Sequence, residues 1–567
     1  MNTIKLSQQL QHSGFNISSE LSSRFKKLIN QGIKASFIAF FINSFTVSGQ
    51  EVECTQKADS EESVTIDKLT LISHPVFDEN QPDSLYLHSL ANWLHINTQQ
   101  HVVEKLLPFT QADVISRAQF AETERILNQY SFLRKSRVSL IKDCESQQEN
   151  ELKVETWDTW SLVPYISFGR RAGNNKYAFG FKEDNFLGLG VHAGVQYKKD
   201  HLRSGYQVAF SMPLSFPKQS TVELEFADND DGQKTYLAYS KPFYQQSSKQ
   251  QHLASMLKEN RRDSIYQNGE LAWQFSHEVE QSTLAFGHLI TQDQLGAVRM
   301  HLGINKELHR FTNLDSTILA ELPSDRRFTF PWIGLEYSQA DYQIFSNIRF
   351  IDHREDINLG WQLISKIGVD ISSLITDESQ GLHLENILSK GMQWQNTLML
   401  FSTSYKAYWQ GEQPDHQQVA AELELYQYLT PRWAGYFKAQ WQAEKNQYLD
   451  IPLALGGDTG VRGYAEQYQH GEHLWSASAE LRYNPHWELY QLVNVAWAAF
   501  VDSGKAWGQT PETNSTDTTL QSIGIGARLF SSHSSEGNVV HMDIIKPLTT
   551  GPNVDSWQWR IQVKQSL

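Results

Sequence analysis

The chain has 567 residues and a formal net charge of −15, and it contains no basic run that could follow a phosphate backbone, which argues against nucleic acid as a partner. Aromatic residues make up 12% of the chain although its mean hydropathy is −0.47. Aromatic side chains placed at every second position of a polar sequence are typical of a membrane β-barrel, and also of a large soluble β-sandwich or propeller. Composition by itself leaves both architectures open.

The N-terminus has the order of a secretory signal. Residues 35–47 form a mostly apolar run, with lysines before it and the small residues Ser48 and Gly49 after it. The sequence therefore predicts a signal peptide over residues 1–49, cleaved near Gly49–Gln50, with a retained anchor as the alternative. The sequence has no other apolar stretch long enough to cross a bilayer as a helix, so a membrane location requires a closed barrel.

Residues 50–160 predict a small α+β domain. Apolar residues alternate from Val64 to Leu71, and two amphipathic helices follow, which Thr98 and Ser116 can cap at their N-termini. Two further alternating segments, at 138–140 and 152–154, complete the order β-α-α-β-β.

The two cysteines, Cys54 and Cys144, flank strands of this small domain. An even cysteine number in an exported protein favours a disulfide, which would stabilise the domain by about 2–4 kcal/mol. Two free thiols are the alternative.

Residues 161–567 alternate with period two, which predicts an antiparallel β-barrel with lipid outside and a hydrated lumen inside. The connections alternate in length: those at 430–432 and 484–486 are tight, and those at 446–470 and 503–517 are long. Counted back from the C-terminus, the predicted strands lie near 556–566, 538–547, 518–530, 491–502, 472–483, 433–445 and 416–429. As many as twenty candidate strands can be drawn, and some of them could be loop hairpins.

The long connection at 446–470 contains the sequence Val461-Arg462-Gly463-Tyr464, and the next two strands contain Glu480 and the segment Phe500-Val501-Asp502-Ser503-Gly504. Together with FGFKEDNFLGLG in the opening strands, these segments resemble the BamA/TamA superfamily of outer-membrane barrels, the bacterial surface antigen family, which includes the two-partner-secretion transporters. The resemblance implies about 16 strands and a loop folded into the lumen. It also identifies residues 50–160 as a single POTRA-like periplasmic domain.

Strand phase agrees with this resemblance. If Trp475 and Leu481 face lipid, Glu480 faces the lumen, and by the same alternation Asp502 faces the lumen from the neighbouring strand. The planar guanidinium of Arg462 could bridge the two carboxylates, and Gly463 would let the loop turn sharply beside the wall. We therefore predict a loop lock formed by Val461, Arg462, Gly463, Tyr464, Glu480 and Asp502. An isolated VRGY tetrapeptide could also be an ordinary surface loop.

Two features depart from the family. The alternation yields more than sixteen strands, and the chain ends in Gln565-Ser566-Leu567 rather than in an aromatic residue.

The resemblance implies an outer-membrane barrel that inserts proteins into the membrane or translocates them across it. Its partners would be outer-membrane lipid and a client or periplasmic protein bound through the POTRA-like domain. The alternatives are a pore or lipid- and solute-handling scaffold, or a small domain that is a plug or spacer and binds nothing. No catalytic motif is present, and the 20 histidines lack ligand spacing, so the sequence predicts no enzyme activity, cofactor or metal.

Overall fold

The structure is a computed structural model that describes residues 63–564, apart from 78–85, 143–149, 172–173, 201, 294–295, 315–321, 373–380, 411–414, 458–459, 491, 510–513, 515 and 532–537. The proposed signal peptide, both cysteines and Leu567 lie outside the described residues. The signal and the disulfide therefore stay predictions.

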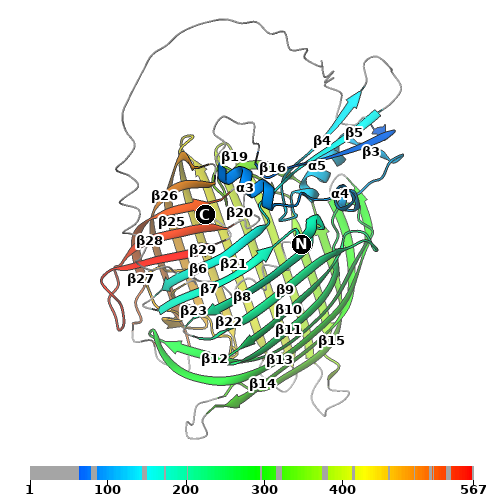
Figure 1. The fold of residues 1–567 in the computed structure, drawn as a ribbon. Coiled ribbons are helices and arrows are strands. Elements are labelled where there is room, and N and C mark those ends of the chain that lie inside the picture. Colours follow the sequence, from blue (N-terminus) through cyan, green and yellow to red (C-terminus); the bar gives the residue numbers. More distant parts are fainter. Residues whose placement is uncertain are drawn as a thin grey trace, which may run out of the picture.

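The chain from residue 162 onward forms a closed antiparallel β-barrel, as predicted (Figure 1). In barrel order the strands are β6 (Leu162–Arg171), β7 (Asn174–Glu183), β8 (His192–Lys199), β9 (Ser204–Leu214), β10 (Ser220–Asn229), β11 (Gly232–Lys241), β12 (Gln250–Gln267), β13 (Glu270–Asp293), β14 (Gly296–Asn313), β15 (Arg326–Ser338), β18 (Gln362–Val369), β19 (Gly381–Trp394), β20 (Thr397–Gln410), β21 (His416–Tyr428), β22 (Trp433–Lys445), β25 (His473–Leu489), β26 (Val493–Trp507), β27 (Leu520–Phe530), β28 (Val539–Pro547) and β29 (Gln558–Lys564). Over the described residues the barrel thus has twenty strands rather than the sixteen implied by the resemblance, and the higher count from alternation was the better guide.

The two faces of the barrel wall differ as the alternation predicts. In β26, Trp497 and Val501 are each 46% exposed on the outer face, whereas Phe500 and Asp502, on the opposite face, are buried. Because the outer side chains are apolar, this surface fits lipid, and the inner surface carries the polar groups. Among the described residues, no helix has the length and apolar character needed to cross a membrane.

One predicted turn is wrong. The sequence 484–486 was expected to join two strands, but β25 continues to Leu489, with an irregular register between Tyr483 and Trp487. His486 adopts a positive φ of 59° within this bulge. The Asn484 side chain instead donates a hydrogen bond to Asp352, a residue far away in sequence (2.7 Å). A bulge redirects a side chain without ending the strand, and sequence alone does not distinguish it from a turn.

The small domain has the predicted β-α-α-β-β order, with additional short elements. Its sheet has the order β2-β5-β4, in which β2 is parallel to β5. The elements are β1 (Ser63–Thr65), β2 (Lys68–His74), α3 (Tyr86–Leu94), α4 (Gln100–Leu106), β3 (Val114–Ser116), α5 (Arg117–Leu127), β4 (Leu133–Lys142) and β5 (Asn150–Asp158). Val103, Leu127 and Leu152 lie in a buried core that the helices and the sheet share. Ser116 precedes α5 as predicted, and its amide donates to the Gln119 side chain (2.7 Å).

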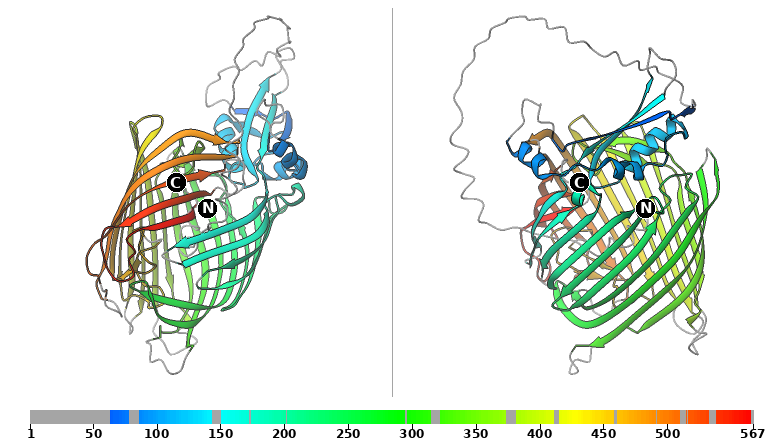
Figure 2. Two further views of the ribbon diagram at one scale, coloured as in Figure 1. Left: turned by 60° about the vertical axis from the view of Figure 1, so that its left-hand side comes forward. Right: turned by 45° about the vertical axis from the view of Figure 1, so that its right-hand side comes forward.

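The small domain lies at one mouth of the barrel, called here the domain-side mouth (Figures 1 and 2). The 3-10 turn Phe186–Gly188, between β7 and β8, contacts it: the Gly188 carbonyl accepts a hydrogen bond from the Gln99 amide (3.0 Å). Counting alternate connections from this turn places the loop at 446–472 at the opposite, far mouth.

Asp158, the last residue of β5, positions Thr98, the residue of the small domain that the barrel contacts through Asn185. Its carboxylate accepts hydrogen bonds from the Thr98 amide (2.7 Å) and hydroxyl (2.9 Å), and it pairs with His95 (2.9 Å). Asn185, in the connection after β7, donates to the Thr98 hydroxyl in turn (2.9 Å). Thr98 was expected to cap a helix, but Gln99 occupies the N-cap position of α4. The Thr98 hydroxyl donates to the distant residue Asp158 instead of capping the helix.

The substitution Asp158→Ala is expected to loosen the small domain by about 3 kcal/mol, because it leaves buried donors on Thr98 without an acceptor. Limited proteolysis should cut the small domain faster, while the heat-modified gel mobility of the barrel stays unchanged. Asp113→Ala is the control, because Asp113 accepts from Thr110 at an exposed turn (2.6 Å). Equal protease sensitivity of the two variants would contradict this role for Asp158.

Candidate functional site: a loop lock in the lumen

The loop between β22 and β25 folds into the far mouth of the barrel. Its short strands β23 (Ala454–Leu455) and β24 (Gln469–His470) pair with each other. Apolar side chains of the loop pack against the inner wall in one buried cluster. The cluster contains Leu453, Leu455, Val461, Tyr464, Ala465 and Tyr468 of the loop, with Leu474, Ala506 and Leu520 of the wall. The loop is therefore part of the barrel interior.

Arg462 forms the predicted lock with both acids. Its Nε and Nη2 donate to the two carboxylate oxygens of Asp502 at 2.6 Å each, and its Nη1 donates to Glu480 at 2.8 Å. The Arg462 backbone amide also donates to Asp502 (3.1 Å), and Nη2 reaches the Ser478 hydroxyl (2.8 Å). Only arginine offers this planar set of donors, so the site is specific for a guanidinium.

The register of β25 and β26 brings the two acids within reach of one side chain. Ser478 lies opposite Asp502, and Glu480 lies opposite Phe500, so both carboxylates project from adjacent strands into the lumen. The Phe500 ring lies 3.4 Å from the Arg462 guanidinium carbon and covers one face of the cation. The side chain of Asp502 is fully buried and that of Glu480 nearly so. Because these carboxylates are buried away from solvent, their charges are stabilised by their ionic and hydrogen-bonding partners.

The remaining motif residues place Arg462 at this depth. Val461 is fully buried in the loop cluster, and the Tyr464 hydroxyl donates to the Gln521 carbonyl (2.6 Å) and accepts from the Thr549 amide (3.1 Å). Gly463 has a φ of +92°, a left-handed conformation that other residues rarely adopt. All six residues of the predicted lock therefore lie together.

The substitution Gly463→Ala is expected to destabilise the lock by about 1–3 kcal/mol, from strain at positive φ and from overpacking. An added Cβ would lie 2.8 Å from Ile545 Cγ2. The variant should expose the loop to added protease and lower the temperature of heat modification. Gly435→Ala is the matched control, since its Cβ would meet only Gln427 at 3.8 Å. A resistant loop in Gly463→Ala would mean that this position tolerates a side chain.

A second layer of charge surrounds the lock. Glu480 also accepts a hydrogen bond from Arg482 Nε (3.0 Å), and Arg528 pairs with Asp543 at 2.6 Å. Arg528 also lies 4.0 Å from Glu480. Guanidinium groups and carboxylates thus alternate along the inner wall of β25–β28, which balances their buried charge.

A hairpin from the opposite mouth also enters the barrel. The connection 339–361 contains β16 (Tyr342–Ser346) and β17 (Arg354–Asn358), which pair with each other outside the barrel sheet. We call this segment the lumenal hairpin. At its tip, Ile351 packs in a buried cluster with Ala496, Phe530 and Val539 of β26–β28, far from the hairpin's own neighbours β15 and β18. The lumenal hairpin therefore crosses the interior at the domain-side mouth.

The lumenal hairpin and the loop lock meet at one acid. Arg482 donates to Glu480 through Nε and to the Ile348 carbonyl of the hairpin through Nη1 (3.3 Å). Because Glu480 also binds Arg462, a continuous polar path links Arg462, Glu480, Arg482 and Ile348. The two segments that fill the lumen from opposite mouths are thus connected through Glu480.

Sequence reasoning found the lock but missed its surroundings. Ser478, Arg482 and Phe500 are in phase with Glu480 and Asp502, but strand phase gives them no role, and Arg528, Asp543 and the lumenal hairpin were not foreseen. The available signal was the in-phase charge of β25, β27 and β28. Nothing local in the sequence indicates which charges pair.

Similar solved structures cover most of the chain, whereas the matching family model covers only residues 339–529. Among solved structures, CdiB from Acinetobacter baumannii is 10% identical, covering 99% of this chain and 98% of its own, with a TM-score of 0.43. CdiB from Escherichia coli is 11% identical (91% and 92% covered, TM-score 0.38), and BamA from Haemophilus ducreyi lacking POTRA domains 1–3 is 12% identical (88% and 84% covered, TM-score 0.39). No curated protein matches the chain. The family model described as haemolysin secretion/activation protein ShlB/FhaC/HecB matches residues 339–529, so the segment that runs from the lumenal hairpin through the loop lock to β27 is similar to that family.

Proposed function

We propose that this chain is an outer-membrane channel that moves a client protein across the membrane. The observation that carries the proposal is the polar path from Arg462 through Glu480 and Arg482 to the lumenal hairpin. A permanent solute pore needs an open lumen, whereas here two chain segments occupy it, the loop held by ion pairs of Arg462 and the hairpin by a hydrogen bond from Arg482, and such contacts can be exchanged. The match of this same segment to haemolysin secretion/activation proteins supports a polypeptide as the transported molecule.

In this proposal the small domain is POTRA-like and lies in the periplasm, where it receives the client. β2 and β4 are the outer strands of its described sheet, and an extended peptide could add to such an edge by main-chain hydrogen bonds. Barrel residues of the connection after β7 contact the domain, because Asn185 donates to the Thr98 hydroxyl and the Gly188 carbonyl accepts from the Gln99 amide. A client bound there would be held at the domain-side mouth, beside the lumenal hairpin.

The proposal includes no enzyme activity. One serine-histidine-aspartate contact does occur: the Ser161 hydroxyl lies 3.3 Å from His95 Nδ1, and His95 Nε2 lies 2.9 Å from Asp158. The three side chains are buried at the junction of the domain and the barrel, and Asp158 also accepts from Thr98. We infer that this contact is structural, because a hydrolase serine must be accessible to its substrate.

Deletion of the gene, followed by proteomics of the outer membrane and of secreted material, tests the function. Translocation predicts the loss of one or a few surface or secreted proteins, restored by the wild-type gene. A general fall in barrel proteins would instead indicate insertion of barrels into the membrane. Unchanged protein profiles together with impaired solute uptake would support the alternative of a pore or solute-handling scaffold.

A further inference from the structure

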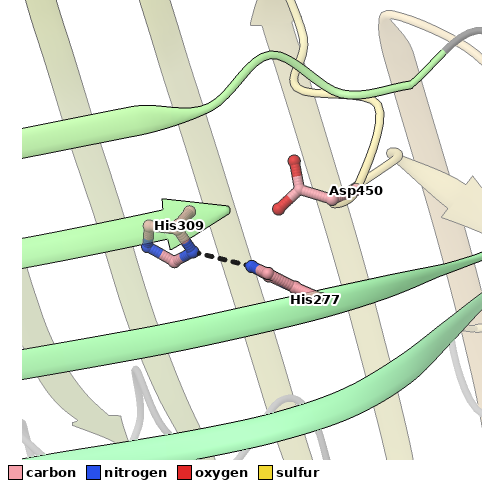
Figure 3. Close-up of side chains that lie close together, drawn as sticks. All are labelled: His277, His309 and Asp450. Carbon is pink, nitrogen blue, oxygen red and sulfur yellow. Dashed lines mark hydrogen bonds between the residues drawn. The ribbon is translucent and has the colours of Figure 1, made fainter. Parts of the chain in front are cut away.

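Two histidines and one aspartate lie close together (Figure 3). They are at the far mouth of the barrel, away from the loop lock. His277 lies on β13, His309 on β14, and Asp450 in the loop 446–472. One ligand atom from each lies within 4.8 Å of the others, and His277 Nε2 is 3.0 Å from His309 Nδ1. The three residues are distant in sequence, so a search for metal-ligand spacing along the chain could not detect them.

The contacts of His277 prepare its Nε2 atom to act as a ligand. Its Nδ1 lies 2.6 Å from the Asp263 carboxylate, which Arg261 Nε holds from the other side at 2.7 Å. A carboxylate on Nδ1 keeps the proton there and leaves the Nε2 lone pair free to bind a cation. This carboxylate–histidine arrangement is the usual support for a metal-binding imidazole. The His277 side chain is almost fully buried, so its orientation is fixed.

The partners of Asp450 hold its carboxylate beside the two rings. Arg326 Nη1 and Nη2 each donate to one Asp450 oxygen at 2.8 Å, and the Arg326 guanidinium lies 4.1 Å from the Tyr448 ring centre. Each carboxylate oxygen retains a second lone pair, so Asp450 can bind a cation while it remains paired with Arg326. The positive charge of Arg326 opposes a cation, which favours an ion that forms strong bonds to nitrogen over one held by charge alone.

We propose that His277, His309 and Asp450 bind a divalent transition-metal ion of the zinc type. Two imidazoles and one carboxylate are a common zinc ligand set, with metal–ligand distances of about 2.0–2.2 Å that leave a fourth position for water. Without the ion, the His309 Nδ1–H donates to His277 Nε2. When the ion binds between the two nitrogens, neutral His309 carries its proton on Nε2 instead.

The ion would fasten the loop 446–472 at a second wall. Arg462 holds this loop to β25 and β26, whereas the metal ligands lie on β13 and β14, separated from them in barrel order by β15 and β18–β22. A bound ion would therefore keep the loop stretched across the far mouth and slow its release. This inference is independent of the proposed transport function.

Metal binding can be measured on the full chain purified in detergent and stripped of metal. Titration with Zn²⁺ should give one site per chain, and Co²⁺ should give visible d–d absorption. His277→Gln and His309→Gln should each abolish this site, and Asp263→Asn should weaken it about 10- to 100-fold, as for other residues that support metal ligands. Affinity should also fall as pH falls, because protons compete for the imidazoles.

His301→Gln is the matched control, since His301 lies on the same strand β14 and also faces a carboxylate, that of Glu336 (3.0 Å). It should bind Zn²⁺ as the wild type does. Heat-modified gel mobility checks that every variant is folded. In the wild type, Zn²⁺ should protect the loop 446–472 from added protease. Wild-type binding no tighter than that of folded His277→Gln, or equal loss in His301→Gln, would overturn the proposal.

Discussion

Replacing Arg462 with alanine is expected to release the loop from the lumen and to reduce transport of the client at least about tenfold. The variant leaves the buried carboxylates of Asp502 and Glu480 without their shared cation, and breaking a buried ion pair on one side costs about 3–5 kcal/mol. Because 1.4 kcal/mol corresponds to a factor of ten, that loss exceeds what a tenfold change requires. Arg462→Lys should restore little, since one ammonium cannot replace donors from Nε, Nη1 and Nη2.

Three measurements test this prediction together: protease cleavage in the loop 446–472, the temperature of heat modification, and the amount of secreted client. Arg432→Ala is the control, because Arg432 is exposed in the tight connection between β21 and β22. A combined variant, Arg462→Ala with Asp502→Asn, removes the carboxylate that depends on Arg462 and keeps Glu480 as the partner of Arg482. It should recover barrel stability without recovering transport. Wild-type transport in Arg462→Ala would refute the lock.

Removal of the lumenal hairpin is expected to raise the conductance of the barrel in planar bilayers several-fold. Ser338 and Gln362 lie directly opposite each other in β15 and β18, so an Asn-Gly turn can replace residues 339–361 without disturbing the sheet. The excision removes the tip residue Ile351 from its buried cluster on β26–β28. It also removes the Ile348 carbonyl, which accepts a hydrogen bond from Arg482. Both changes open the domain-side mouth.

Single-channel recording measures this effect, and sensitivity of cells to large antibiotics gives an independent readout. Ile344→Ala is the matched control within the lumenal hairpin, because Ile344 is 57% exposed and its truncation leaves the tip in place. That variant should conduct as the wild type does. If excision left the conductance unchanged in a correctly folded barrel, the loop at the far mouth would be sufficient to close the lumen.

The shared position of Glu480 suggests how the two closures depend on each other. Its carboxylate binds Arg462 of the loop and Arg482, which in turn holds the lumenal hairpin. Movement of the loop takes Arg462 away from Glu480, and movement of the hairpin takes the Ile348 carbonyl away from Arg482. Each movement leaves a buried charged group of this path with fewer partners, which weakens the contacts that hold the other segment. Coupling between the mouths is therefore expected to pass through this one residue.

Strand phase is a local property, so it predicted the two inward acids of the lock, whereas the inward fold of the loop that carries Arg462 was implied by the family resemblance. In a strand, alternate residues face opposite sides, so the lipid-facing tryptophans at 475 and 497 were sufficient to turn Glu480 and Asp502 inward. The same alternation located the barrel start near residue 161 and the bounds 433–445 of β22. The β-α-α-β-β order of the small domain also followed from local periodicity.

Tertiary structure alone decided the features that depend on distant partners. Residues 484–486 read as a turn, and only the contact from Asn484 to Asp352 reveals the bulge. The sequence predicted Thr98 as a helix cap, but in the structure its hydroxyl donates to the buried carboxylate of Asp158. The lumenal hairpin and the meeting of His277 with His309 and Asp450 depend on how a closed sheet of twenty strands brings its walls and loops together. Period-two patterning fixes which way each side chain points, but it carries no information about which inward side chains meet across the lumen.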